Sequence, residues 1–293
     1  MWSSMKKKLI TTIMAIITAL ISRADASMVI MDYQGDTIVH PYGIERALLL
    51  NSDDGRYVDI AVRPLDNFVS STDGKVQIPL ENFYINNNTE DVYMRFNEYS
   101  YLFRNIALGG AAQNITARVK DYGMVPSGVY NIMLEIQTID ADTQTVLFNT
   151  NFNLQFIVPV VQSMSFHNVK PKISVGTENA FTKNTKIPSD TAPMLYINSN
   201  KDWILTLNTD NLDDTVGNFY IRTISASTNV NERLQERVLL QPHKDIVIAK
   251  GKAPSNNEYV SIEYSIETKD GKIFPAGKYS NRFRYRLSED REK

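Results

Sequence analysis

No cysteine occurs anywhere in the 293 residues, so no disulfide bond can stabilise the fold. A chain without disulfides depends on the apolar core of each of its domains. Histidine is also scarce: His40, His167 and His243 are far apart in the sequence, and none has a spacing typical of a metal site. The sequence therefore predicts no cofactor and no metal centre built from histidine or cysteine.

Motifs of catalysis and of nucleic-acid binding are absent too. The chain has no Gly-x-Ser-x-Gly elbow and no glycine-rich phosphate loop, and its Gly109-Gly110 pair is typical of a turn after an apolar strand. Basic residues number 31 against 33 acidic ones, whereas a nucleic-acid surface needs an excess of positive charge. We therefore expect neither an enzyme nor a nucleic-acid-binding protein.

The first residues have the pattern of an export signal. Lys6–Lys8 precede the apolar run Leu9–Ile21, and Ala24 and Ala26 are the small residues that a signal peptidase reads. The run is shorter than the roughly 20 residues that a membrane span needs. We expect cleavage after Ala26 and no membrane insertion afterwards. The signal contains four of the 31 basic residues and one of the 33 acidic residues, so the remaining chain would carry 27 basic and 32 acidic side chains.

Strand patterns dominate the rest of the chain. Short runs rich in Val, Ile, Thr, Tyr and Phe alternate with turns rich in Asn, Asp, Gly and Pro, as in Val58–Val62 and Ile132–Ile136. The period of two predicts one face toward a core and one toward water. Only Val230–Leu240 suggests a helix, with a polar edge strand as its alternative. The fold class predicted is all-β.

Three blocks of sequence occur twice in the same order. Leu50–Asp66 aligns with Ile197–Asp213, the tetrapeptide NFYI recurs, and Pro-x-Gly-x-Tyr occurs at Pro126–Tyr130 and Pro275–Tyr279. We interpret this as two copies of one fold rather than a solenoid. The expected organisation is a signal at 1–26, immunoglobulin-like β-sandwiches at 27–159 and 191–293, and between them a segment at 160–190 that includes a possible first strand of the second sandwich. In each copy the strand after Pro-x-Gly-x-Tyr is expected to close the domain.

An exported, cysteine-free sandwich that ends in Pro275-Ala276-Gly277-x-Tyr279 and an alternating strand resembles bacterial pilus subunits and spore-coat or fimbrial surface proteins. The resemblance implies a non-enzymatic structural or interaction protein of the cell surface or periplasm. Self-association or protein partners are then expected, with strand-edge pairing as the mechanism. The terminal segment Ser27–Gly35 is the strand expected to be exchanged with a neighbour.

Two other binding functions stay open. One is an adhesin module that binds carbohydrate or protein, and the other is a periplasmic pilus chaperone. Chaperones of that kind have two immunoglobulin-like domains and a basic cleft near the first strand, but here that region has few Lys or Arg residues. The acidic turns Asn51–Asp54 and Asp210–Asp214 leave calcium binding open, although neither matches a known calcium loop.

Two groups of residues are candidates for binding. The first is a cluster of aromatic residues that could stack on sugar rings or anchor a protein, or could simply form core. The second is a series of arginines on alternate positions of the last strand, which could grip an anion or could protect a sheet edge from unwanted pairing. The candidates are Tyr93, Phe96, Tyr99, Tyr101 and Phe103 in the first group, and Arg282, Arg284 and Arg286 in the second.

Overall fold

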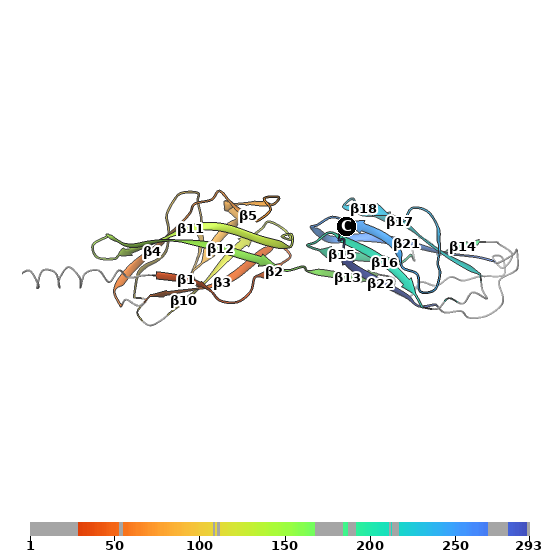
Figure 1. Cartoon of the computed structure of the whole chain (residues 1–293), viewed down its shortest axis with the longest axis horizontal. Coiled ribbons are helices and arrows are strands. Elements are labelled where there is room, and N and C mark those ends of the chain that lie inside the picture. The colour runs from red at the N-terminus through yellow and green to blue at the C-terminus, as the bar shows by residue number, and fades with distance from the viewer. Residues whose placement is uncertain are drawn as a thin grey trace, which may run out of the picture. The chain divides into compact units, whose positions relative to one another are not determined.

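The computed structural model describes residues 29–52, 55–107, 109, 112–167, 184–186, 192–210, 212, 217–268 and 281–291. The predicted signal segment therefore lies outside the described residues. The chain forms two compact units, which we call domain 1 and domain 2 (Figure 1). Most of domain 1 is Gly43–Tyr122 with Val129–Ile157, and most of domain 2 is Val158–Lys293. Among the described residues, no helix is long and apolar enough to cross a membrane.

One sheet of domain 1 has the strand order β1-β3-β10-β7-β8, with β2 also paired to β3. Strand β3 runs antiparallel to β1 and β10, and its Leu48 and Leu50 are completely buried on the core side. The strands are β1 (Val29–Tyr33), β2 (Ile38–His40), β3 (Gly43–Ser52), β7 (Phe83–Asn86), β8 (Asp91–Tyr93) and β10 (Gln113–Lys120).

The second sheet of domain 1 has the order β6-β5-β11-β4-β9, and β12 also pairs with β11. Strands β4 and β5 follow each other along one edge of β11, since Leu65 N–H donates to Met133 O (2.8 Å) between them. Strand β12 pairs with β11 as the next strand of the chain. The elements are β4 (Tyr57–Pro64), β5 (Phe68–Ser71), β6 (Gln77–Pro79), the 3-10 turn η1 (Leu80–Asn82), β9 (Ser100–Ala107), β11 (Gly128–Asp140) and β12 (Val146–Val158).

The first sheet of domain 2 repeats the order of domain 1, with β13-β15-β21-β17-β19 and β14 on β21. The two NFYI segments occupy equivalent places, because β7 pairs with β10 and β17 pairs with β21. Phe83 and Phe219 are both buried there. The strands are β13 (Gln162–His167), β14 (Asn184–Lys186), β15 (Met194–Ser199), β17 (Asn218–Ala226), β19 (Val238–Leu239) and β21 (Ser255–Glu267).

The second sheet of domain 2 has four strands in the order β18-β20-β16-β22. Its core includes Trp203, which is fully buried and donates its indole N–H to Ser255 Oγ at 2.8 Å. The described parts of both domains are thus antiparallel sandwiches, and the predicted all-β class is confirmed. The strands are β16 (Trp203–Thr209), β18 (Val230–Arg233), β20 (Ile246–Gly251) and β22 (Phe283–Glu289).

The structure decides one open alternative and corrects one expectation. Val230–Leu240 contains strands, which was the alternative to a helix, because Leu234 forms hydrogen bonds to neighbouring strands: its N–H donates to Ile248 O (2.8 Å), and its C=O accepts from Thr223 N–H (2.7 Å). In domain 1, the strand after Pro126–Tyr130 is not the closing one. The short turn after Asp140 leads into β12, which follows β11 and adds a further strand to its sheet.

Candidate functional site

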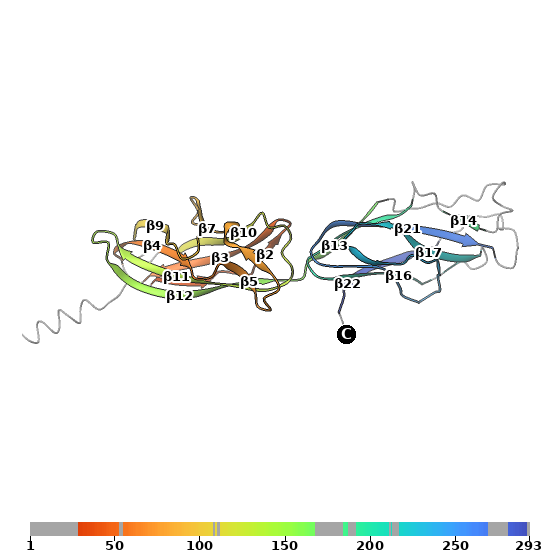
Figure 2. The same cartoon turned by 90° about the horizontal axis from the view of Figure 1, so that it is seen from above.

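The edge of domain 2 formed by β13 and β22 is the first candidate site. Strand β22 pairs with β16, and none of the described strands pairs with its other side. Strand β13 is likewise the outermost strand of the facing sheet, and Figures 1 and 2 show the two strands side by side. The rings of Phe166 on β13 and Tyr285 on β22 meet edge to face with centroids 5.7 Å apart. We call this region the open edge and define it by Met164, Phe166, Phe283, Tyr285 and Leu287.

Apolar side chains along the open edge are incompletely covered. Phe283, Tyr285 and Leu287 alternate toward the core but are only partly buried, and Phe166 is 42% exposed. The corresponding strand of domain 1 gives an internal comparison. There, inward-facing side chains of β11 are at most 1% exposed. The two domains differ here because β12 pairs with β11, whereas no described strand does the same for β22. The buried β11 side chains are Tyr130, Ile132, Leu134 and Ile136.

Side chains of domain 1 also seal the outer edge of β12. The Tyr33 hydroxyl donates to Asn153 O (2.7 Å) and accepts from Gln155 N–H (2.9 Å). Thr37 Oγ1 accepts from Ile157 N–H at 2.9 Å, and the Arg46 guanidinium donates to Gln155 O. Backbone groups that a further strand could have paired with are therefore already bonded in domain 1. The described part of domain 2 shows no such seal along β22.

A row of aromatic rings fixes the shape of the open edge. Tyr264 on β21 stacks on Phe283 with centroids 4.7 Å apart, and its hydroxyl is hydrogen-bonded to that of Tyr285 across the two sheets. Burial raises the pKa of both tyrosines well above the usual range, so both stay neutral at physiological pH. A neutral, apolar and preformed wall suits an apolar occupant better than a charged one.

The three candidate arginines lie on β22 or directly before it, but not in the open edge. Arg282, Arg284 and Arg286 are exposed on the opposite side of the alternation from Phe283 and Tyr285. Arg284 forms an ion pair with the carboxylate of Asp210. The alternation predicted from the sequence is present, and the charges line the outer face of an edge strand.

The candidate aromatic segment is divided between separate environments. Tyr93 and Phe96 are 60% and 49% exposed. Tyr99 instead donates its hydroxyl to Glu135 Oε2 at 2.9 Å. Tyr101 and Phe103 are half-buried on β9. Of the five residues, Tyr93 and Phe96 therefore offer the large exposed ring area.

Tyr99 belongs to a small polar cluster on the second sheet of domain 1. The Arg63 guanidinium lies 4.7 Å from the centre of its ring and also pairs with Glu135. Burial, and then the neighbouring carboxylate, raise the pKa of Tyr99. Burial alone would raise the pKa of Glu135, but hydrogen bonds from Asn149, Tyr99 and Arg63 outweigh it and lower that pKa. Each member is bonded to another, and such a satisfied polar network stabilises the sheet.

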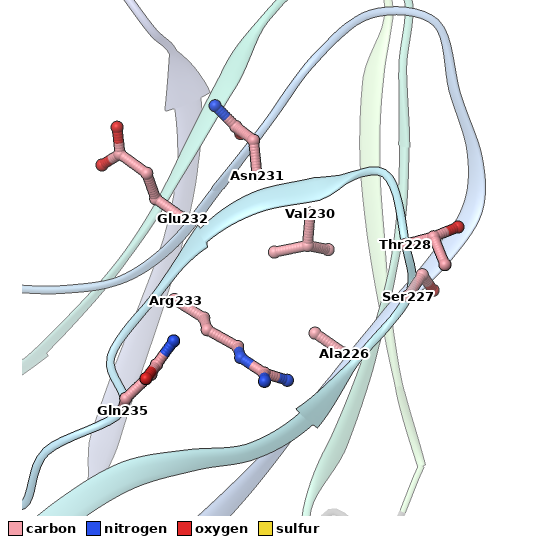
Figure 3. Close-up of a pocket in the computed structure, with 8 residues that line it drawn as sticks. All are labelled: Ala226, Ser227, Thr228, Val230, Asn231, Glu232, Arg233 and Gln235. Carbon is pink, nitrogen blue, oxygen red and sulfur yellow. The ribbon is translucent and has the colours of Figure 1, made fainter.

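A polar hollow of about 600 Å³ lies beside the β17–β18 turn (Figure 3). The Arg233 side chain points into it, and Val230 is buried beneath. Glu232 points away from the hydroxyls of Ser227 and Thr228, so the hollow holds no nucleophile beside a base. Among the described residues, no group of three or more acidic or histidine side chains could hold a metal ion.

Sequence reasoning missed Phe166 as a residue of the site. It lies in a polar stretch between the repeated blocks, where the composition gives no indication of a binding residue. The available signal was the alternation of Met164 and Phe166 with Ser163 and Ser165, which is the period of a half-buried strand.

No family model matches the chain, and no curated protein matches it significantly. Among solved structures it is similar to self-complemented MyfA, the major subunit of Myf fimbriae from Yersinia enterocolitica (16% identity, TM-score 0.32, 45% of this chain and 98% of that chain). It is also similar to the CupB6 tip adhesin from Pseudomonas aeruginosa (9%, 0.36, 92% and 95%) and the adhesin CfaE of enterotoxigenic E. coli (9%, 0.31, 91% and 78%). These neighbours are fimbrial subunits and adhesins, but at such TM-scores the likeness carries no argument about function.

Proposed function

We propose that this chain is an exported, non-enzymatic interaction protein of the bacterial surface or periplasm, and that it assembles as fimbrial-type subunits do, by pairing of strand edges. Domain 2 is the acceptor in this proposal. A strand from a partner inserts beside β22 and covers the half-exposed side chains of the open edge. The observation that carries the proposal is the contrast between the buried β11 of domain 1 and the partly covered β22 of domain 2.

The physical argument has two parts. An unpaired strand edge presents backbone N–H and C=O groups in a row, and an added strand bonds to them whatever its sequence. Beside that edge, Phe166 and Tyr285 offer apolar area that selects a strand with apolar side chains at alternate positions. Charge on the outer face of β22 keeps that face in water.

The donor that we propose is residues 27–35 of a second copy. Strand β1 is an edge strand, and its inward residues Val29, Met31 and Tyr33 alternate as a donor requires. In the structure these residues pair with β3 of their own domain, so donation requires β1 to leave that sheet. The burial of Val29 and Met31 in domain 1 stabilises β1 in its own sheet and so opposes its transfer to a partner. A free peptide with the sequence of this segment would compete with the partner's β1 for the open edge.

The test uses the chain from Ser27 onward. Wild type is compared with a deletion of residues 27–35 by size-exclusion chromatography with light scattering, and a synthetic 27–35 peptide is titrated into each. Trp203 reports binding, because it is the only tryptophan after Trp2 and lies in the core of domain 2. We expect a monomeric deletion variant whose domain 2 binds the peptide, and weaker binding in Phe166→Ala. Unchanged assembly of the deletion variant, or peptide binding that is insensitive to Phe166, would overturn the proposal.

A further inference from the structure

A pocket of about 410 Å³ in domain 1 is the second place where the structure offers a binding surface. This volume lies within the roughly 300–1,000 Å³ usual for small-ligand sites. Its lining includes the buried apolar side chains of Leu80 and Met94 and exposed side chains from three segments. We call it the aromatic pocket, and its lining residues are Asn67, Leu80, Glu81, Tyr93, Met94, Arg95 and Phe96.

The loop that carries most of the pocket is held in place by backbone hydrogen bonds. Asn97 donates its N–H to Pro64 O (3.0 Å), and its φ of 57° turns the chain sharply back. At the start of this loop, Met94 N–H donates to Phe83 O at 3.4 Å. The Ser100 hydroxyl bonds to Tyr93 O at 3.2 Å. These bonds hold the pocket in shape, so a ligand need not order the loop on binding.

The orientation of Tyr93 is also set by the protein. Its ring packs against that of Tyr84 with centroids 5.3 Å apart, and the Lys120 ammonium lies 5.5 Å from the centre of the Tyr84 ring. Tyr93 nevertheless remains 60% exposed, and Phe96 remains 49% exposed. Two large aromatic side chains are thus accessible at one pocket, whose lining also includes buried Leu80 and Met94.

Polar groups at the pocket identify the ligand class. Glu81 supplies carboxylate oxygens that accept hydrogen bonds, Asn67 an amide that both donates and accepts, and Arg95 a donor. The guanidinium of Arg95 lies 3.8 Å from a carboxylate oxygen of Glu98, so the surroundings of the pocket have no surplus of positive charge. An acidic ligand would therefore meet the carboxylates of Glu81 and Glu98 beside Arg95, and a purely apolar one would leave the polar groups facing it without hydrogen bonds.

From this combination we infer that the aromatic pocket binds a neutral hexopyranose unit of an oligosaccharide. The apolar C–H face of the sugar ring lies on Tyr93 or Phe96, and neighbouring hydroxyls bond to Glu81 and Asn67. This pocket lies in domain 1 and uses none of the residues of the open edge. A failure of strand exchange in domain 2 therefore does not affect the test of sugar binding.

The test uses the chain from Ser27 onward on an array of neutral and acidic glycans, followed by calorimetry with the best neutral oligosaccharide. Tyr57→Ala is the matched control, because Tyr57 is also 60% exposed but lies outside the pocket. We expect at least a tenfold loss of affinity in Tyr93→Ala and Phe96→Ala, and none in the control. Circular dichroism and melting curves check the fold of each variant.

Glu81→Gln keeps the proposal falsifiable if an aromatic variant fails to fold. Its side chain is exposed on η1, so the substitution should leave stability unchanged while weakening the sugar affinity severalfold. Three results would overturn the inference. They are no binding to any neutral glycan, equal affinity in wild type and the pocket variants, and a preference for acidic glycans that Glu81→Gln does not change.

Discussion

The comparison of β11 with β22 makes a quantitative prediction about the stability of domain 2. The perturbation is to attach residues 141–158, which form the turn after β11 and then β12, behind Asp290, so that the copied strand can fold back along β22. In domain 1 this segment buries Leu154, Phe156 and Val158 against the core. The graft should cover the open edge in the same way.

The magnitude follows from the exposure of the side chains that the graft would cover. Burying a phenylalanine completely contributes roughly 1.5–3 kcal/mol, so the 42% exposure of Phe166 corresponds to about 1 kcal/mol. The partly buried Phe283, Tyr285 and Leu287 bring the total to roughly 2–4 kcal/mol. The apolar burial and hydrogen bonds of the graft's own residues offset the conformational entropy that the graft loses when it becomes ordered. At about 4 °C per kcal/mol for a domain of this size, the midpoint should rise by roughly 8–16 °C.

The assay is thermal unfolding followed by Trp203 fluorescence, which reports domain 2. A matched control carries the same graft with serine at the three positions copied from Leu154, Phe156 and Val158, so that length and turn are kept and apolar burial is lost. Equal midpoints for the graft and the control would refute the reasoning, since they would show that β22 has no apolar area to be covered by an added strand.

Three further predictions concern the core and pH. Gly251→Ala should destabilise domain 2 by about 1–3 kcal/mol in urea unfolding, because a Cβ there would lie 2.3 Å from the Trp203 ring; an unchanged midpoint would contradict this packing. Because the pKa of Glu135 is lowered in the fold, its contribution to stability should be complete above its unfolded pKa of about 4.3 and lost as pH falls through the lower folded value. The protection factors of the β11 amides, which are corrected for the intrinsic pH dependence of exchange, should therefore fall in acid in wild type, and Glu135→Gln should show a weaker fall. Because burial raises the pKa of Tyr285 and Tyr264, their contribution to stability should be constant below the unfolded pKa of about 10 and should fall above it. The double Phe variant should then lose less stability above this pH when the unfolding of domain 2 is followed by Trp203 fluorescence.

Local patterns predicted the parts of the fold that depend on local physics. The alternation in Ile132–Ile136 marked side chains that are buried in β11, and the arginines around Phe283 and Tyr285 are exposed as their positions indicated. The pattern in Val230–Leu240 was ambiguous, because it is short and charged, and hydrogen bonds to neighbouring strands decided it. Of the aromatic segment, Tyr93 and Phe96 line the aromatic pocket, together with Asn67 and Glu81 from segments that carried no signal of their own.

Sequence by itself determined the strand-rich class, the inward and outward faces of the strands and the dependence on apolar cores, because side-chain alternation and composition act locally. Tertiary structure alone decided which strand edges are covered. Whether β12 continues the sheet beside β11, whether Tyr33 and Arg46 seal its outer edge, and whether Phe166 meets Tyr285 all depend on contacts between residues distant in the chain. The periodicity of a single strand carries no information on those contacts, since it specifies a face but not a neighbour.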